Sequence, residues 1–282
     1  MDQVDLKTSA KNTWCPGCGN FAILNALKVV LKQLHEEDTG LENVVLVSGI
    51  GCHAKIVDYV KVNSFYSLHG RVVPVAEGIK LARPGVKVIG FSGDGDSYGE
   101  GLAHLMFAAK RNIDITMIIH NNRVYGLTTG QYTPTSPLGF KGKSTPKGTL
   151  ESPLNPLEVM LSCKAGFIAR AYTHGIELLK SILREAVRHK GFSLVDVLQV
   201  CVTFNNMYEY YTKKVYELKD HDPENFDTAL AKIREWDYNN DAPIALGTFY
   251  KKESPTLDQK ITLPNQSISD RDSKIREVLN KM

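Results

Sequence analysis

The stretch from residue 86 to residue 126 constrains the fold of this chain more than any other part of the sequence. It opens with apolar, β-branched residues and breaks at Gly93-Asp94-Gly95. A helical pattern follows, and then a second apolar run at residues 115–119. A strand, a helix and a second strand in this order predict two parallel strands of an α/β sheet. We therefore expect the fold to be α/β, with a parallel doubly wound sheet.

Two oxygen-bearing side chains come at the ends of these predicted strands. Asp94 ends the first strand, and Asn122 follows the second. The carboxyl ends of neighbouring parallel strands share one edge, where open α/β sheets bind their ligands. The intervening helix, which we expect to begin near Gly99, directs unpaired amide groups towards the same edge, and such groups suit a phosphate. A carboxylate, an amide oxygen and phosphate oxygens together favour magnesium.

Length and charge exclude several classes of protein. A chain of 282 residues can bury a substantial core in one large domain or two small ones. The 34 basic and 31 acidic residues give a formal net charge of +3, which is too weak to indicate nucleic-acid binding. No apolar run reaches the roughly 18 residues of a membrane span. Residues 1–14 are polar and lack the apolar core of a signal peptide, so we expect a cytoplasmic protein.

Four of the five cysteines lie where the predicted fold can bring them together. Cys15 and Cys18 form a Cys-x-x-Cys motif directly before a predicted helix, whose positive end should favour thiolates. Cys52 follows a predicted strand at residues 44–48, and Cys201 follows another that begins at residue 193. These strand ends belong to the same edge as Asp94, so the thiols are expected to converge there.

Two kinds of metal site suit four thiolates, namely a 4Fe-4S cluster and a Cys₄ zinc site. Zinc sites usually draw their ligands from two local pairs, whereas Cys52 and Cys201 are isolated on separate loops. We therefore favour the cluster. An odd number of cysteines without a secretory signal argues against a disulfide framework. The fifth, Cys163, is interpreted as a small buried apolar residue on a helix.

The motifs together resemble one family. Gly-Asp-Gly followed about thirty residues later by paired asparagines resembles the diphosphate-binding motif of thiamine diphosphate enzymes. Within that superfamily the chain resembles the β subunit of 2-oxoacid:ferredoxin oxidoreductases over nearly its whole length. One departure is Thr129-Gly130, where the family often has two glycines. The resemblance rests on CPGCGN at 15–20, GIGC at 49–52, LHGR at 68–71, AEGIKLARP at 76–84, GDGD at 93–96, NNRVYGLTTGQ at 121–131 and QVC at 199–201.

The resemblance implies cofactors and the residues that hold them. Thiamine diphosphate would bind through a magnesium ion held by Asp94, the side chain of Asn122 and the carbonyl of Val124. A 4Fe-4S cluster would be held by Cys15, Cys18, Cys52 and Cys201. Candidates for contact with the substrate or the reacting part of the cofactor are Lys55, His69 and Leu127; read without the resemblance, Lys55 is a solvated lysine and Leu127 a core leucine. The expected cofactor-binding residues are Gly51, Cys52, His69, Gly70, Arg71, Gly93, Asp94, Gly95, Asp96, Asn122, Val124, Tyr125, Gly126 and Leu127.

The resemblance also implies a reaction and partners. The reaction is the coenzyme A-dependent oxidative decarboxylation of a 2-oxoacid, such as pyruvate or 2-oxoglutarate, to acyl-CoA and carbon dioxide, with electrons passed to ferredoxin. Only the diphosphate-binding half of a thiamine site is recognised in this chain. The pyrimidine-binding half would belong to a separate α subunit, and a dimer of such heterodimers is one assembly consistent with the family.

Residues 1–203 are predicted to form the cofactor-binding domain, and residues 204–282 an irregular C-terminal extension that packs on the partner subunit. Within the extension we expect one helix at residues 225–236, and residues 128–156 are expected to be a long loop. Two other functions remain open from the residues alone. One is a non-oxidative thiamine decarboxylase or synthase subunit, which needs no cysteine cluster. The other is a zinc-stabilised scaffold without catalysis.

Overall fold

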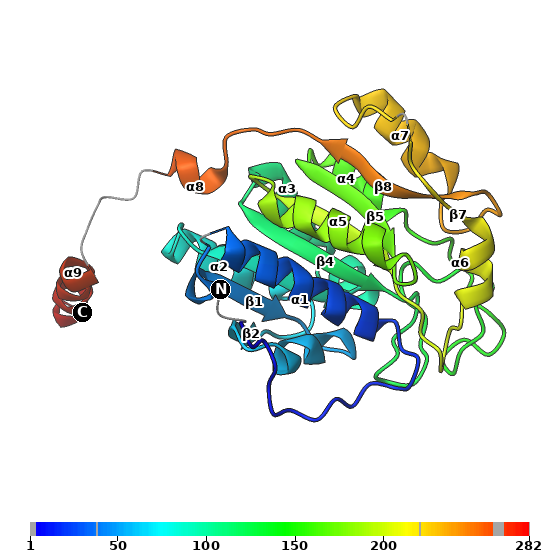
Figure 1. Cartoon of the computed structure of the whole chain (residues 1–282), viewed down its shortest axis with the longest axis horizontal. Helices are drawn as coiled ribbons and strands as arrows, with labels where there is room; N and C mark the ends of the chain where they lie inside the picture. The colour runs from blue at the N-terminus through cyan, green and yellow to red at the C-terminus, as the bar shows by residue number, and fades with distance from the viewer. Residues whose placement is uncertain (1–3, 38, 220, 262–267, 282) are drawn as a thin grey trace.

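The computed structural model describes residues 4–37, 39–219, 221–261 and 268–281. These residues include an eight-stranded sheet in the order β2-β1-β3-β4-β6-β5-β8-β7, shown in Figure 1. The first six strands along the chain are all parallel, and β8 runs antiparallel to β5. The strands are β1 (Val44–Ser48), β2 (Asn63–Tyr66), β3 (Lys87–Gly93), β4 (Ile115–Asn121), β5 (Phe167–Tyr172), β6 (Ser193–Leu198), β7 (Val215–Glu217) and β8 (Ile244–Lys251).

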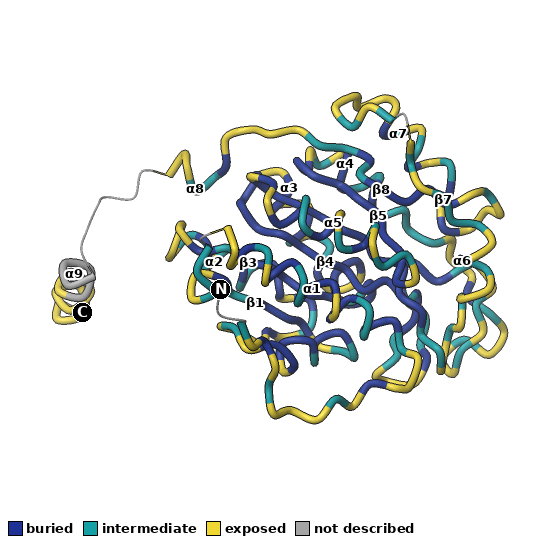
Figure 2. The backbone as a smooth tube through the Cα atoms, in the orientation of Figure 1, coloured by how far each residue is buried: buried dark blue, intermediate teal, exposed yellow. Residues whose placement is uncertain are grey.

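Helices cover both faces of the sheet, as a doubly wound fold requires. On one face, α1 and α5 bury residues such as Leu31 and Leu183 against the strands. On the other face, α2, α3, α4 and α7 bury their apolar sides. Figure 2 shows the buried strands between these layers and the exposed loops around them. The helices are α1 (Asn20–Glu36), α2 (Val72–Ala82), α3 (Leu102–Arg111), α4 (Pro156–Ser162), α5 (Ile176–Arg188), α6 (Tyr208–Lys214), α7 (Phe226–Glu235), α8 (Leu257–Lys260) and α9 (Ile268–Asn280).

The four strands expected from the sequence are consecutive neighbours in the sheet. They are β1, β3, β4 and β6, so the loops that carry Cys52, Asp94, Asn122 and Cys201 all leave the same edge. The predicted helix start near Gly99 is wrong. A single π-helical turn, Gly95–Glu100, begins directly after Asp94, whose own backbone is already helical, and α3 follows it. Such turns are frequent at functional sites.

The expectation of an irregular C-terminal extension is wrong for residues 208–251. This stretch contains two helices and two strands, and β8 pairs with β5 of the main sheet. Trp236 and Tyr238 are buried in a third apolar cluster together with Tyr172 of β5. The expected helix is confirmed as α7, whose amino end is capped by the Asn225 side chain. One sheet therefore continues across residue 203, and the packing of this region on a partner subunit stays a prediction.

No helix in the described part of the chain has the length and apolarity to span a membrane. The long loop is confirmed, because residues 122–155 contain only turns and isolated bridges.

Candidate functional site

A pocket at the carboxyl edge of the sheet collects most of the predicted cofactor-binding residues. We call it the strand-end pocket. It is formed by the loops after β1, β3 and β4, together with the loop before α2, which contributes His69. Its lining is Ile50, Gly51, Cys52, His53, His69, Gly93, Asp94, Gly95, Asp96, Asn122, Val124, Tyr125, Gly126, Leu127 and Thr128.

Asp94 is the buried carboxylate of this pocket that sequence analysis assigned to magnesium. Its residue is 2% exposed, and Oδ2 lies 2.8 Å from the hydroxyl of Thr135. Burial raises the pKa of Asp94 to about 6, although hydrogen bonds from Thr133 and Thr135 oppose this shift. Burial disfavours an isolated charge, so a cation at this position would stabilise the ionised form.

Asn122 and Val124 lie beside each other in the same pocket. The side-chain amide of Asn122 donates to Gln199 Oε1 at 2.9 Å, and its Oδ1 accepts the backbone N–H of Val124 at 3.1 Å. The backbone carbonyl of Asn122 accepts a hydrogen bond from Asn205. Hydrogen bonds with Gln199 and Asn205 thus hold the loop after β4 in place, and they fix the direction of the Asn122 amide oxygen.

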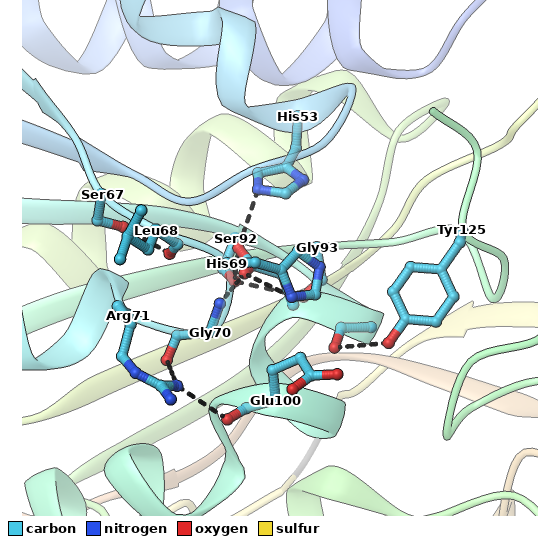
Figure 3. A network of polar contacts seen from close by, with 12 residues as sticks. His53, Ser67, Leu68, His69, Gly70, Arg71, Ser92, Gly93, Glu100 and Tyr125 are labelled. Atoms are coloured by element: carbon cyan, nitrogen blue, oxygen red, sulfur yellow. Dashed lines mark hydrogen bonds and ion pairs between the residues drawn. The ribbon is translucent and has the colours of Figure 1, made fainter. Parts of the chain in front are cut away.

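A second carboxylate, that of Asp96, contacts residues of β3 and of two loops of the strand-end pocket, and Figure 3 labels these partners as His53, His69, Gly70 and Ser92. Its oxygens contact the backbone N–H of Gly70, the hydroxyl of Ser92 at 2.7 Å, His53 Nε2 at 3.2 Å and His69 Nδ1 at 3.8 Å. Burial by itself favours the neutral acid, yet the contacts with His53, Gly70 and Ser92 outweigh it and lower the pKa of Asp96.

Gly70 and Arg71 were predicted to bind the cofactor, but neither is among the described residues that line the pocket. The N–H of Gly70 donates to Asp96. The guanidinium of Arg71 donates to the backbone carbonyls of Gly70 and Glu100 at 3.2 Å and 3.3 Å. These donors are therefore engaged within the protein, where they attach the loop before α2 to the turn after β3.

The four predicted cluster cysteines line a second, adjacent pocket, which we call the cysteine pocket. It shares Cys52, Asn122 and Gly126 with the strand-end pocket. A Cβ atom at Gly126 would lie 3.7 Å from Cys201 Sγ and 3.8 Å from Cys52 Sγ, so this residue lies between the two thiols. The lining is Thr13, Trp14, Cys15, Cys18, Asn20, Cys52, Lys55, Asn122, Gly126, Gln199, Cys201, Val202, Thr203 and Phe204.

The expectation that the helix end favours thiolates is wrong for Cys18. Burial raises the pKa of Cys18 to about 11, the nearby thiols add to the shift, and a hydrogen bond from the Asn20 backbone opposes it only in part. Burial likewise raises the pKa of Cys52, against the lowering effect of Lys55. Desolvation outweighs the helix terminus because the thiolate charge has little solvent to stabilise it.

Lys55 and Leu127 lie at the two pockets in different ways. Lys55 lines the cysteine pocket and donates to the Thr13 hydroxyl at 2.8 Å, but it does not line the strand-end pocket. Leu127 lines the strand-end pocket and is 48% exposed, so it is no core leucine. Cys163 lies outside the cysteine pocket and packs against the apolar core, but it is only partly buried and directly follows α4, so the expectation of a buried residue on the helix is wrong in both respects.

Sequence reasoning missed three residues of the site. His53 directly follows Cys52, and its position next to that motif was the available signal. Thr135 lies in the long loop, where no periodicity marks it. Gln199 precedes Cys201 by two residues and holds Asn122. Their roles depend on contacts between distant segments.

Comparison with known proteins places these features in a family. The model of the thiamine pyrophosphate enzyme C-terminal TPP-binding domain matches residues 49–197, and that of the C-terminal part of the pyruvate ferredoxin oxidoreductase β chain matches residues 201–264. The 2-oxoacid:ferredoxin oxidoreductase subunit beta of Saccharolobus solfataricus is 42% identical over 277 residues, which cover 92% of this chain and 88% of that protein.

Two further proteins extend the comparison. The 2-oxoglutarate oxidoreductase subunit KorB of Mycobacterium tuberculosis is 43% identical over 204 residues, covering 72% of this chain and 53% of its own. Among solved structures, the 2-oxoglutarate:ferredoxin oxidoreductase from Magnetococcus marinus with 2-oxoglutarate, coenzyme A and succinyl-CoA bound has a TM-score of 0.85 and 33% identity. The match covers 98% of this chain and 89% of the other.

Proposed function

This chain belongs to the β subunits of the 2-oxoacid:ferredoxin oxidoreductases, and on that premise we propose that it carries the thiamine diphosphate and the electron-transfer centre of such an enzyme. The reaction converts a 2-oxoacid, such as pyruvate or 2-oxoglutarate, and coenzyme A into acyl-CoA and carbon dioxide. Two electrons leave through a 4Fe-4S cluster to ferredoxin. The observation that carries the proposal is that the strand-end pocket and the cysteine pocket share Cys52, Asn122 and Gly126.

The strand-end pocket fits a magnesium diphosphate. Asp94 provides a buried carboxylate, Asn122 an amide oxygen and Val124 a backbone carbonyl, and oxygen ligands of this kind suit magnesium. The cation would offset the cost of burying the Asp94 charge, and the diphosphate would complete its coordination. The thiamine ring, when bound, supplies the electron sink for decarboxylation. This chain's own residues hold and orient it.

The cysteine pocket fits a cluster better than a single zinc ion. Tetrahedral zinc with bonds of about 2.3 Å requires its four sulfurs to meet closely around one point. Cys52 and Cys201 lie on separate loops, and together with Cys15 and Cys18 they line one common pocket. A larger inorganic body with four thiolate ligands matches that arrangement.

The two pockets are adjacent because they share Cys52, Asn122 and Gly126, and this supports a function that uses both of them. Because these residues line both pockets, they would hold a thiamine cofactor on one side and a cluster, which would supply the electron acceptor, on the other. A non-oxidative thiamine subunit would have no use for the four converging cysteines. A zinc-stabilised scaffold would have no use for the buried Asp94 beside Asn122.

The remaining assignments follow from the family. We infer that the pyrimidine-binding half of the site comes from an α subunit, that ferredoxin is the electron acceptor and that the enzyme works in the cytoplasm; a dimer of heterodimers is one assembly consistent with this. His69 and Leu127 line the strand-end pocket and are assigned to cofactor and substrate contact. Lys55 lines the cysteine pocket and is assigned to the substrate carboxylate, because it is a cation beside Cys52.

The test is production with the α subunit under anaerobic conditions, followed by assays with several 2-oxoacids. We expect about four irons, one magnesium and one thiamine diphosphate per β subunit, and acyl-CoA formation that depends on coenzyme A and ferredoxin. A colourless zinc protein would support the scaffold. Decarboxylation without ferredoxin reduction would support the non-oxidative enzyme.

A further inference from the structure

The carboxylate of Asp96, in the turn after β3, connects that turn with the loop after β1 and the loop before α2 at the strand-end pocket. Oδ1 accepts the N–H of Gly70 and lies 3.8 Å from His69 Nδ1, while Oδ2 accepts the hydroxyl of Ser92 at 2.7 Å and lies 3.2 Å from His53 Nε2. The side chain of Asp96 is 1% exposed. Both oxygens therefore have protein partners, which come from the loops after β1 and before α2 and from β3 itself (Figure 3).

Two glycines, Gly49 and Gly93, leave room for the side chains of Asp96 and His53. A Cβ atom at Gly49 would lie 1.8 Å from Asp96 Oδ2, and one at Gly93 would lie 2.9 Å from His53 Nδ1. Any larger residue at Gly49 would displace the carboxylate. The contact between Asp96 and His53 thus depends on glycine at these positions, as well as on the two side chains.

Asp96 and Asp94 differ in what they offer to a ligand, although they are two residues apart. The Asp94 carboxylate is contacted by hydroxyl groups of the long loop, and Asp94 lines the strand-end pocket, where we propose it as a magnesium ligand. The Asp96 carboxylate contacts His53, His69, Gly70 and Ser92. A carboxylate that was free in this pocket would repel a diphosphate, whereas one with protein partners holds those partners in place.

The loops that Asp96 holds carry residues of both pockets. The loop after β1 includes His53 and the adjacent Cys52, which lines both pockets. The loop before α2 includes His69 and Gly70. From this geometry, and resting on the function proposed above, we propose that Asp96 is a positioning residue that fixes the loops of His53 and His69 around the cofactor and thereby also places Cys52.

Three variants of Asp96 separate the effect of the position of its side chain from the effect of its charge. Asp96→Asn removes the charge but keeps an oxygen acceptor for the Gly70 N–H, and its NH₂ group, in place of the other oxygen, can donate to Ser92 Oγ and His53 Nε2. Asp96→Glu keeps the charge but displaces it by one methylene. Asp96→Ala removes both. A positioning role predicts that Asn retains loop order and cofactor affinity, whereas Glu and Ala weaken thiamine diphosphate binding at least about tenfold, the usual scale for residues that orient ligands. Asp114→Asn is the matched control, since it alters a buried aspartate at the opposite end of the strands.

Two readouts on the complex with the α subunit decide the matter. Hydrogen exchange of the cofactor-free complex should be faster at residues 49–53 and 67–71 in the Ala and Glu variants only. Calorimetry gives the affinity for thiamine diphosphate with magnesium. Normal exchange and affinity in Asp96→Ala and Asp96→Glu would overturn the proposal, and so would an Asn variant as impaired as Ala. Failure of the wild-type complex to bind thiamine diphosphate would instead refute the proposed function, because the exchange measurement needs no cofactor.

Discussion

The hydroxyl of Thr135 lies 2.8 Å from Asp94 Oδ2 and 3.0 Å from Asn121 Oδ1. A residue of the long loop thus contacts the carboxylate at the end of β3 and the last residue of β4. Asn121 in turn donates to Asp196 of β6, which is also contacted by the hydroxyls of Tyr98 and Tyr238. The proposed magnesium ligand is therefore connected to a buried network that reaches the C-terminal part of the sheet.

We expect Thr135→Val to weaken magnesium-dependent binding of thiamine diphosphate by about tenfold, because outer partners of metal ligands commonly contribute that much. The substitution preserves shape and removes only the hydroxyl that orients Asp94. Titration calorimetry of the cofactor-free complex measures the effect. Thr145→Val is the control, since its hydroxyl donates to Phe140 in the same loop. Equal affinities for the two variants would show that the Thr135 contact does not orient Asp94 for binding.

Cys201→Ala should lower the iron content or give an incomplete cluster and stop ferredoxin reduction. Cys201 lines the cysteine pocket, whereas Cys163 packs against the apolar core. Cys163→Ala should keep a full cluster, so the pair controls for the small cavity that each substitution leaves. Iron and sulfide analysis with electron paramagnetic resonance of the reduced proteins distinguishes them. A normal cluster in Cys201→Ala would refute the four-cysteine assignment.

Thr129→Gly should stabilise the chain by roughly 1 kcal/mol. Thr129 has a φ of 76°, a left-handed conformation that costs a residue with a Cβ atom about 1–2 kcal/mol and costs glycine almost nothing. The loss of an exposed hydrogen bond from Lys143 offsets part of the gain. The neighbouring Thr128 is not among the described residues with positive φ, so Thr128→Gly should destabilise the chain. Thermal unfolding of both variants tests this, and a lower melting temperature for Thr129→Gly would contradict it.

Lys80→Met should lower the free energy of unfolding by about 3 kcal/mol at pH 7, because it leaves the buried carboxylate of Asp114 without its cation. Lys80 Nζ lies 2.7 Å from Asp114 Oδ2, and both side chains are buried. Burial opposes ionisation, but the contacts with Lys80, Lys87 and Gly191 prevail and lower the pKa of Asp114.

The sign of this shift sets the pH dependence. The pKa of Asp114 is lower in the folded chain than its value of about 3.9 in the unfolded chain, so the ionised carboxylate stabilises the fold above that pH. This contribution is lost as the pH falls through the pKa of the folded state. The difference between wild type and Lys80→Met should therefore shrink below about pH 4. Urea unfolding across pH 3 to 7 measures it. A difference that stays constant over this range would show that the Asp114 charge does not contribute.

Local sequence was sufficient for those elements whose signal lies within a few residues. Apolar runs predicted β1, β3, β4 and β6, and the polar residue after each run marked the functional edge, because parallel strands present their carboxyl ends together. Strand β2 was missed because all its residues are exposed, and β7 because its three partly buried or exposed residues are too few to show a pattern. The strand β8 was missed because its partner, β5, lies more than seventy residues earlier in the chain.

By itself, the sequence determined the α/β class, the shared edge and the four strand-end residues Cys52, Asp94, Asn122 and Cys201 that meet there, since these follow from periodicity and from the end of each strand. Only the tertiary structure decided the burial that raises the pKa of Cys18, the contacts of Gly70 and Arg71, and the contacts of His53 and Thr135. Burial depends on everything packed around a group, and a hydrogen bond such as that from Gly70 to Asp96 joins segments 26 residues apart. No local pattern carries that information, because the free energy of such contacts arises only when the folded chain brings the groups together and removes their water.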